Sequence, residues 1–199
     1  MLQIVAATGN AHKVEEMQAI LAPLGIEVLS ARAVGGMPDV DEDGDTFAAN
    51  AIKKAVETAQ ILRRPVLADD SGLEVFALNG EPGIYSARYA GVGGNDGRNV
   101  RKLLTRLDGQ ADRTARFVCV IALASPTGLI GTAEGEVRGH IIDEPRGDHG
   151  FGYDPVFVPE GFEQTFAELP GEVKNRFSHR GNALQQAVTS GLFAGLPTD

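Results

Sequence analysis

The chain is short of cysteine, of basic residues and of long apolar runs, and each shortage excludes a class of protein. Its one cysteine, Cys119, cannot form an internal disulfide, which fits a reducing compartment. Cys119 lies in an apolar run over 117–124, and no neighbour in the sequence would activate a thiol there. We therefore interpret it as a buried strand residue and not as a nucleophile.

No run approaches roughly 18 apolar residues, so no segment is expected to span a membrane. The N-terminus also lacks the basic and apolar stretches of a signal peptide, and we expect a cytoplasmic protein. The 27 acidic residues outnumber the 18 basic ones, for a net charge of −9. That charge repels a nucleic-acid backbone, which argues against polymer binding but permits a small anion where donors cluster.

The order of apolar segments predicts an α/β protein with a mixed sheet, in one domain over residues 1–199. Strands are expected over 2–7, 26–29, 66–68, 73–78, 117–124, 129–142 and 155–158. Helices are expected over 10–24 and from an N-cap at Thr46 to about residue 62, and Asn95 and Ser178 begin two more. Because strand–helix units occur beside a hairpin turned at 126–128, parallel and antiparallel strands should share the sheet.

The first candidate site is the turn Thr8-Gly9-Asn10-Ala11-His12-Lys13, which joins a strand to a helix. The free N–H groups and partial positive charge of a helix N-terminus attract phosphate. Gly9 allows close approach, Thr8 and Asn10 offer hydrogen bonds, and Lys13 adds a full charge. A Walker A loop is excluded because its second glycine and Lys-Ser/Thr pair are missing. Alone, this turn fits a plain helix cap equally well.

The second candidate is the acidic stretch 39–45, whose spacing resembles the start of an EF-hand loop. Its twelfth position is Asn50, where that loop requires a bidentate Glu, so we do not expect an EF-hand. The stretch is either a solvated loop or a source of one metal ligand, Glu42. In the following helix Asn50 and Lys54 share a face, where Lys54 is either a surface lysine or part of a phosphate site.

The third candidate is the pair Asp69-Asp70, which follows the short strand over 66–68 and precedes Ser71 and Gly72. Ligands bind at strand ends in α/β sheets. A carboxylate of pKa about 3.9 is a weak base for water, but a divalent metal lowers the pKa of bound water enough for it to act. Magnesium prefers one or two carboxylates with phosphate oxygens and water. An Asx-type turn is the plainer alternative.

Two further segments carry groups that suit a nucleoside. Phe151-Gly152-Tyr153-Asp154 sets two aromatic rings beside a glycine, as in a base-stacking platform or in a turn with core aromatics. The stretch 174–181 places Lys174, His179 and Arg180 around a predicted helix start, where they could donate to a base carbonyl or to phosphate. Three donors in one short segment favour a ligand site over a structural histidine.

Together these segments resemble the inosine/xanthosine triphosphate pyrophosphatase family, from Thr8 to about Leu184. The matching motifs are Thr8 to Lys13, Glu42 to Phe47, Asn50-Ala51, Lys54-Ala55, Ala68 to Leu73, Pro82 to Tyr89, Phe151 to Pro155 and Ser178 to Gly181. Each motif alone is modest support, but their combination in this order is specific.

The resemblance implies a mixed central β-sheet flanked by helices, with two lobes around a nucleotide cleft, in a homodimer. It implies magnesium-dependent hydrolysis of ITP, dITP and XTP between the α and β phosphates, which gives the nucleoside monophosphate and pyrophosphate. It also implies Asp70 as proton acceptor and metal ligand and Glu42 as a second metal contact. The substrate-binding residues that it implies are Thr8, Gly9, Asn10, Lys13, Lys54 and Ser71 for the phosphates, Phe151, Gly152, Tyr153 and Asp154 for the nucleoside, and Lys174, His179 and Arg180 towards the base.

Two positions depart from the family pattern, which usually has Glu at Ala49 and often Asp at Phe76. Ala49 removes a carboxylate near the expected metal. Two other functions remain open: a nucleotide pyrophosphatase acting on modified pyrimidines or ordinary nucleotides, and a nucleotide-binding sensor without catalysis. Intact Asp69-Asp70 and Lys13 argue against the sensor, since a sensor needs no water-activating carboxylate.

Overall fold

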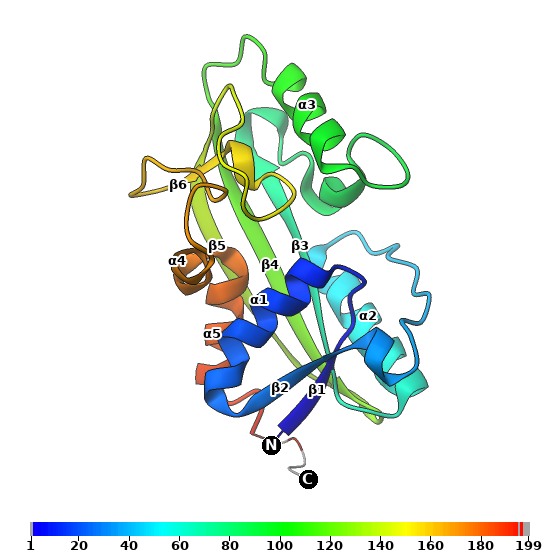
Figure 1. The fold of residues 1–199 in the computed structure, drawn as a ribbon. Coiled ribbons are helices and arrows are strands. Elements are labelled where there is room, and N and C mark those ends of the chain that lie inside the picture. Colours follow the sequence, from blue (N-terminus) through cyan, green and yellow to red (C-terminus); the bar gives the residue numbers. More distant parts are fainter. Residues whose placement is uncertain (1, 195, 197–199) are drawn as a thin grey trace. The chain divides into compact units, whose positions relative to one another are not determined.

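The structure is a computed structural model that describes residues 2–194 and residue 196. Its strands form one six-stranded sheet in the order β2-β1-β3-β4-β5-β6 (Figure 1). The strands are β1 (Leu2–Ala6), β2 (Ile26–Ser30), β3 (Val66–Val75), β4 (Thr114–Ser125), β5 (Gly128–Ile141) and β6 (Phe157–Pro159). The helices are α1 (Ala11–Leu21), α2 (Phe47–Leu62), α3 (Asp96–Arg106), α4 (Gly171–Phe177) and α5 (His179–Thr189).

The sheet combines both strand directions. β1 runs parallel to β2 and to β3, with Val5 opposite Leu29 on one side and Val66 on the other. β6 runs antiparallel to β5. β4 and β5 are neighbours joined by two residues, a connection too short for parallel strands. The predicted α/β class with a mixed sheet is confirmed.

The chain divides into two compact units. The first unit contains residues 1–70, 119–135 and 180–199, and the second contains 71–118 and 136–179. The long strands β3, β4 and β5 contribute residues to each unit. A single domain over residues 1–199 stays a prediction.

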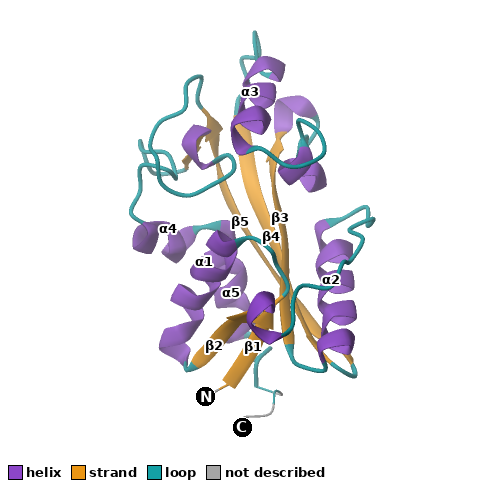
Figure 2. Ribbon diagram, turned by 45° about the vertical axis from the view of Figure 1, so that its right-hand side comes forward, coloured by secondary structure: helices purple, strands orange, loops and turns teal. Residues whose placement is uncertain are grey.

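The first unit buries helices against both faces of its strands. On one face Met17 and Leu21 of α1 and Leu184 of α5 join a cluster with Ile4 and Leu67. Figure 2 shows α2 on the opposite side of β1 and β3 from α1 and α5. The buried face of α2 is rich in alanine, which lets its backbone lie close to the strands: Ala51, Ala55 and Ala59 are fully buried.

The second unit has its own core, built on α3 and on aromatic side chains. Leu103 and Leu107 of α3 are fully buried within it. The rings of Phe117 and Phe157 meet edge to face with centroids 4.8 Å apart, and Phe157 lies 5.2 Å from Phe166. Such aromatic pairs contribute about 0.5–1.5 kcal/mol beyond the area that they bury.

Three predicted helix starts are confirmed by their caps. The side chain of Asn10 accepts from the N–H groups of His12 and Lys13, and Thr46 and Asn95 cap α2 and α3 in the same way. The first helix ends at Leu21 rather than Leu24, because Pro23 turns the next residues into a short 3-10 helix.

Two strand predictions were wrong, and one helix was not predicted. Residues 66–68 and 73–75 belong to one strand, β3, which runs through Asp69 to Gly72 and ends at Val75, and residues 76–78 form a 3-10 turn. The last strand begins at Phe157 and not at Pro155, which lies in a 3-10 turn. Helix α4 was not predicted, because its seven residues are too few for a clear apolar period.

Cys119 lies in β4 with no exposed surface, as predicted, and burial raises the pKa of its thiol to about 12. Across the described residues, none of the helices combines the length and the apolar character that crossing a membrane requires.

Candidate active site

The Asp69-Asp70 pair lies inside β3, in the first unit, with both side chains buried. Neighbouring strand residues point to opposite faces of a sheet, so the two carboxylates make different contacts. Asp69 is bound by two cations: Lys13 Nζ lies 3.0 Å and Arg180 Nη2 lies 2.9 Å from its Oδ2. Burial alone would raise the pKa of Asp69, but Lys13, Arg180 and Lys54 outweigh it and hold the pKa far below its usual range. Asp69 is therefore an anion that neutralises and orients Lys13.

Arg180 is buried at the start of α5, and its guanidinium binds the carboxylates of Asp69 and Glu16. These contacts link α5, β3 and α1. The sequence predicted Arg180 towards the base, and that role stays a prediction.

Asp70 differs from its neighbour in its electrostatics. Burial raises its pKa to about 6, and Glu42 adds to the rise. The charges of Lys54 and Lys13 and a hydrogen bond from the Asn50 side chain lower the pKa but do not offset burial. Asp70 is thus within electrostatic reach of the two lysines and the acid that the sequence grouped with it.

One face of α2 organises the loop that carries Glu42. Lys54 Nζ lies 2.8 Å from Glu42 Oε2, and one turn earlier Asn50 Oδ1 accepts the Gly44 N–H at 2.8 Å. Burial would lower the pKa of Lys54, but the carboxylates of Asp69, Glu42 and Asp70 raise it, so its ammonium stays charged. Gly44 allows the close approach, because a Cβ there would lie 2.8 Å from Asn50 Oδ1.

The turn before α1 is shaped by its own hydrogen bonds. Asn10 Oδ1 accepts from the N–H groups of His12 and Lys13, and the Asn10 N–H donates to Thr8 Oγ1 at 3.1 Å. These bonds fix the turn and hold the side chains of Thr8 and Asn10 within it. Gly9 is exposed, and a Cβ on it would meet nothing within 4 Å. The open side of the turn therefore lies at Gly9.

The surroundings of Asp70 fit a divalent cation. Its Oδ2 atom is buried and has no hydrogen-bond partner among the described residues, which leaves a charged oxygen free for a ligand. Glu42 supplies a second carboxylate nearby. Within residues 2–194 and 196, no group of three or more His, Cys, Asp or Glu side chains could hold a metal. A magnesium ion that takes one or two protein carboxylates and completes its shell with phosphate and water suits such a site.

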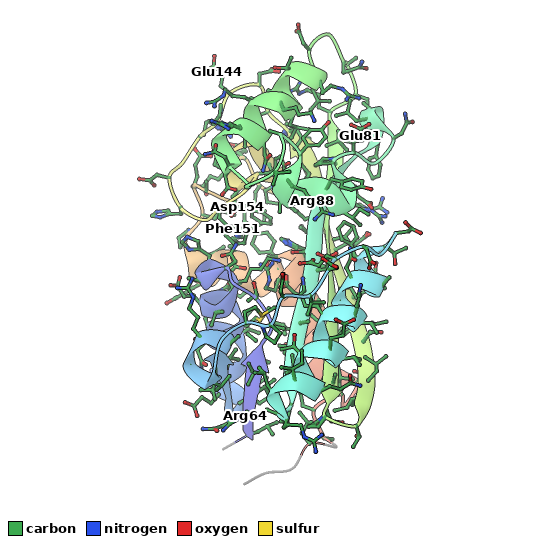
Figure 3. The ribbon with its side chains drawn as sticks, turned by 90° about the vertical axis from the view of Figure 1, so that its right-hand side faces the viewer. Arg64, Glu81, Arg88, Glu144, Phe151 and Asp154 are labelled. Carbon is green, nitrogen blue, oxygen red and sulfur yellow. The ribbon has the colours of Figure 1, made fainter. Side chains whose placement is uncertain are left out.

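In the second unit, a buried ion pair fastens the segment Phe151–Asp154, here called the nucleoside loop. Asp154 Oδ2 accepts the Phe151 N–H at 2.9 Å and Lys174 Nζ at 2.7 Å. Figure 3 labels Phe151 and Asp154 within this loop. Lys174 Nζ also lies 5.1 Å from the centre of the Phe151 ring. Asp154 and Lys174 are 3% and 4% exposed, so their first role is to hold the loop.

The remaining predicted residues of this unit differ in exposure. The Tyr153 ring is buried, and its hydroxyl donates to the Ser86 carbonyl at 2.9 Å. The His179 ring is buried and stacks on Phe117 at 4.7 Å. Ser71 lies half-buried in β3. Their roles towards substrate stay predictions.

Sequence reasoning missed three residues that position others. Asp69 was noted only as a neighbour of Asp70, yet it neutralises Lys13 and Arg180. Asn50 was noted for its place in two motifs and on one face with Lys54, but not as the acceptor of the Gly44 N–H. Asp96, whose Oδ2 accepts the Gly152 N–H at 2.7 Å, carried no signal, since an acidic residue in the first turn of a helix is ordinary.

The two departures from the family pattern lie at exposed positions. Ala49 is in the first turn of α2, where a Cβ on Gly44 would lie 2.8 Å from its own Cβ. Phe76 is 45% exposed in a 3-10 turn after β3. Nothing in the structure explains the choice of Phe76.

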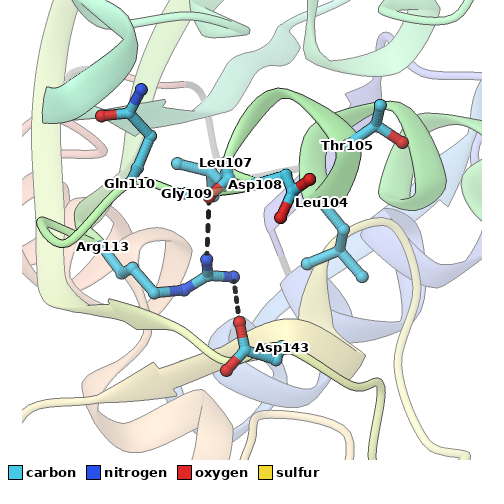
Figure 4. Close-up of a pocket in the computed structure, with 8 residues that line it drawn as sticks. All are labelled: Leu104, Thr105, Leu107, Asp108, Gly109, Gln110, Arg113 and Asp143. Atoms are coloured by element: carbon cyan, nitrogen blue, oxygen red, sulfur yellow. Dashed lines mark hydrogen bonds and ion pairs between the residues drawn. The ribbon is translucent and has the colours of Figure 1, made fainter.

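A cavity of about 570 Å³ lies at the end of α3, and none of the predicted site residues lines it (Figure 4). Its charged wall is Arg113, whose guanidinium donates to the carbonyls of Leu107, Ile141 and Ile142 and pairs with Asp143 at 3.2 Å. This arginine ties α3 to the end of β5.

Comparison with known proteins places the chain in one family. The Ham1 family model matches residues 4–190. A dITP/XTP pyrophosphatase from Desulfotalea psychrophila is 54% identical over 183 residues, which cover 92% of this chain and 82% of the relative. One of the same name from Desulforamulus reducens is 52% identical, with 94% of each chain covered. The solved structure of a HAM1 protein from Coxiella burnetii is 43% identical with a TM-score of 0.85, over 96% of this chain and 98% of that one. The chain belongs to the Ham1 family.

Proposed function

We propose that this chain hydrolyses the non-standard purine nucleoside triphosphates ITP, dITP and XTP to the nucleoside monophosphate and pyrophosphate. Relatives named dITP/XTP pyrophosphatase at 54% and 52% identity support the reaction. The observation that carries it is the Asp70 carboxylate, which is 8% exposed among Lys13, Lys54 and Glu42, with its pKa raised to about 6. A general base works best when its pKa lies near the working pH.

In this proposal the acidic and the basic residues of the site have different roles. Asp70 accepts the proton of the water that attacks the α-phosphorus, and the pyrophosphate then leaves. Lys13 and Lys54 stabilise the negative charge that develops on the phosphate oxygens. Asp70 and Glu42 would hold magnesium, which when bound lowers the pKa of coordinated water and draws charge from the phosphates.

The nucleoside loop and His179 support the preference for a 6-oxo purine. Hypoxanthine and xanthine present a carbonyl at that position, which a histidine N–H can satisfy. Adenine presents an amine there, which would set a donor against a buried donor, and such mismatches are costly. In this proposal Lys174 and Arg180 are further cationic donors towards the base.

We also propose a homodimer in the cytoplasm, where the nucleotide pool lies. The family resemblance supports the dimer. Light scattering coupled to size exclusion tests the assembly, because a monomer at micromolar concentration would contradict it. Cell fractionation with an antibody tests the location.

Pyrophosphate release from a panel of triphosphates tests the function. The wild type should release pyrophosphate from ITP, dITP and XTP with magnesium, release far less from ATP and TTP, and release none with excess EDTA. Asp70→Asn should lower kcat by about 10²–10⁴-fold while substrate still binds. Asp43→Asn, which changes an exposed acid of the same loop, should keep wild-type turnover. Near-normal activity of Asp70→Asn would refute its role, and equal use of all triphosphates would favour the general pyrophosphatase.

A further inference from the structure

Gly152 is the residue of the nucleoside loop whose backbone is both unusual and open. Its φ is +63°, and a Cβ on it would meet nothing within 4 Å. Its neighbours are fastened to the core of the second unit through the Asp154–Lys174 pair and the Tyr153 hydroxyl. Gly152 therefore offers a free backbone face in a loop that is otherwise anchored.

The Gly152 N–H is bound by a residue far away in the sequence. It donates to Asp96 Oδ2 at 2.7 Å, across 56 residues of chain. Asp96 is the first residue of α3, directly after the N-cap Asn95. A carboxylate there is stabilised by the partial positive charge of the helix N-terminus, and hydrogen bonds to ionised acceptors are stronger than neutral ones.

Helix α3 is itself held in place one turn further on. Asn99 is 2% exposed, its Oδ1 accepts the Ala90 N–H at 2.8 Å, and its Nδ2 donates to the Ala87 carbonyl at 3.1 Å. These bonds join α3 to the 3-10 helix Gly83–Arg88 and to the residues directly after it. Asp96 thus reaches Gly152 from a helix that is anchored within the same unit.

We propose that Asp96 is a positioning residue for nucleoside recognition. By binding the Gly152 N–H, its carboxylate fixes the loop backbone at the conformation in which the open face of Gly152 can receive the nucleoside. The Gly152 N–H is then occupied, so this glycine contributes close approach to the ligand and not a donor. The inference rests on the proposed function, because that function assigns the nucleoside to this loop.

The structural alternative is that Asp96 only stabilises the start of α3. A variant of the neighbouring N-cap residue, Asn95, distinguishes the two roles. Asn95→Ala removes the side-chain bond to the Arg98 N–H and destabilises the same helix end, but leaves the Asp96 carboxylate. Asp96→Asn keeps an oxygen acceptor for Gly152 without the charge, whereas Asp96→Ala removes the acceptor.

The test compares wild type, Asp96→Ala, Asp96→Asn and Asn95→Ala in the full chain. We expect Asp96→Ala to raise KM for ITP about tenfold with kcat within twofold. The dissociation constant of inosine monophosphate, measured by calorimetry, should rise in proportion, while that of pyrophosphate stays unchanged. Asp96→Asn should recover most of the affinity, and Asn95→Ala should lower the melting temperature but keep wild-type KM.

Other results distinguish a failure of the proposed function from a failure of the inference about Asp96. A wild type that binds inosine monophosphate but releases no pyrophosphate from ITP contradicts the proposed function and leaves the binding comparison valid. Equal binding of the monophosphate by wild type and Asp96→Ala overturns the inference alone. A loss of affinity in Asn95→Ala as large as that in Asp96→Ala also overturns it, since helix stability would then explain the effect. Failure of the wild type to bind the monophosphate while it releases pyrophosphate from ITP overturns the inference and leaves the proposed function standing.

Discussion

Replacement of Lys174 by methionine should destabilise the protein severely. The Lys174 ammonium lies 2.7 Å from Asp154 Oδ2, and the two side chains are 5% and 4% exposed. Removing one partner of a buried pair leaves an uncompensated carboxylate in the protein interior, which lowers the free energy of unfolding by about 3–5 kcal/mol. With about 2–4 °C of melting temperature per kcal/mol for a chain of this size, the melting temperature should fall by about 6–20 °C. Methionine keeps most of the apolar stem, so lost volume contributes little.

The exposed pair Lys53–Asp43 provides the matched control. Its ions are also 2.7 Å apart, but the side chains are 31% and 72% exposed. Lys53→Met should hardly change the melting temperature, because water already screens that pair. Circular dichroism at 222 nm is the suitable probe, since the chain has no tryptophan. The double variant Lys174→Met/Asp154→Asn should recover most of the loss. Equal melting temperatures for Lys174→Met and Lys53→Met would refute the reasoning.

Two further substitutions address stability elsewhere. The Thr58 hydroxyl is buried in α2 with no hydrogen-bond partner among the described residues. Thr58→Val should therefore raise the free energy of unfolding in urea by about 1 kcal/mol. A decrease would show that the hydroxyl makes a hydrogen bond. Burial, with a hydrogen bond to Glu81, raises the pKa of Tyr89 to about 12. The folded protein therefore favours the neutral form of Tyr89. The contribution of Tyr89 to the free energy of unfolding is complete below the unfolded pKa of about 10 and should be lost as the pH rises from about 10 to 12. Tyr89→Phe should lose less stability than wild type over that range in urea titrations, and parallel losses would contradict the assignment.

The helix starts could be predicted because their causes are local. A cap and the N–H groups that it accepts from lie within three residues, so Asn10, Thr46 and Asn95 carry their signal in the sequence. The residues near Asp70 could be proposed for a different reason, namely the resemblance, which joins distant motifs that periodicity alone does not relate.

The continuity of β3 and the setting of Asp69 could not be predicted. Two aspartates, a serine and a glycine have low strand propensity, and they indicated a turn. One of the two cations that bind Asp69 is Arg180, which lies 111 residues away. The same limit applies to Asp96 and Gly152, since nothing local marks a carboxylate whose partner is 56 residues further on. Tertiary charge compensation overrides local preference in each case.

The division of the chain into segments bears on its synthesis. Every segment of the second unit, 71–118 and 136–179, is translated before Arg180. The first unit needs its final segment, which begins at that arginine and supplies a cation for the buried Asp69. A nascent chain halted before residue 180 would hold a buried aspartate lacking this counter-charge. Folding of the first unit should therefore finish only after helix α5 has been synthesised, and truncations that remove α5, which buries Arg180, Ala183 and Leu184, should unfold this unit.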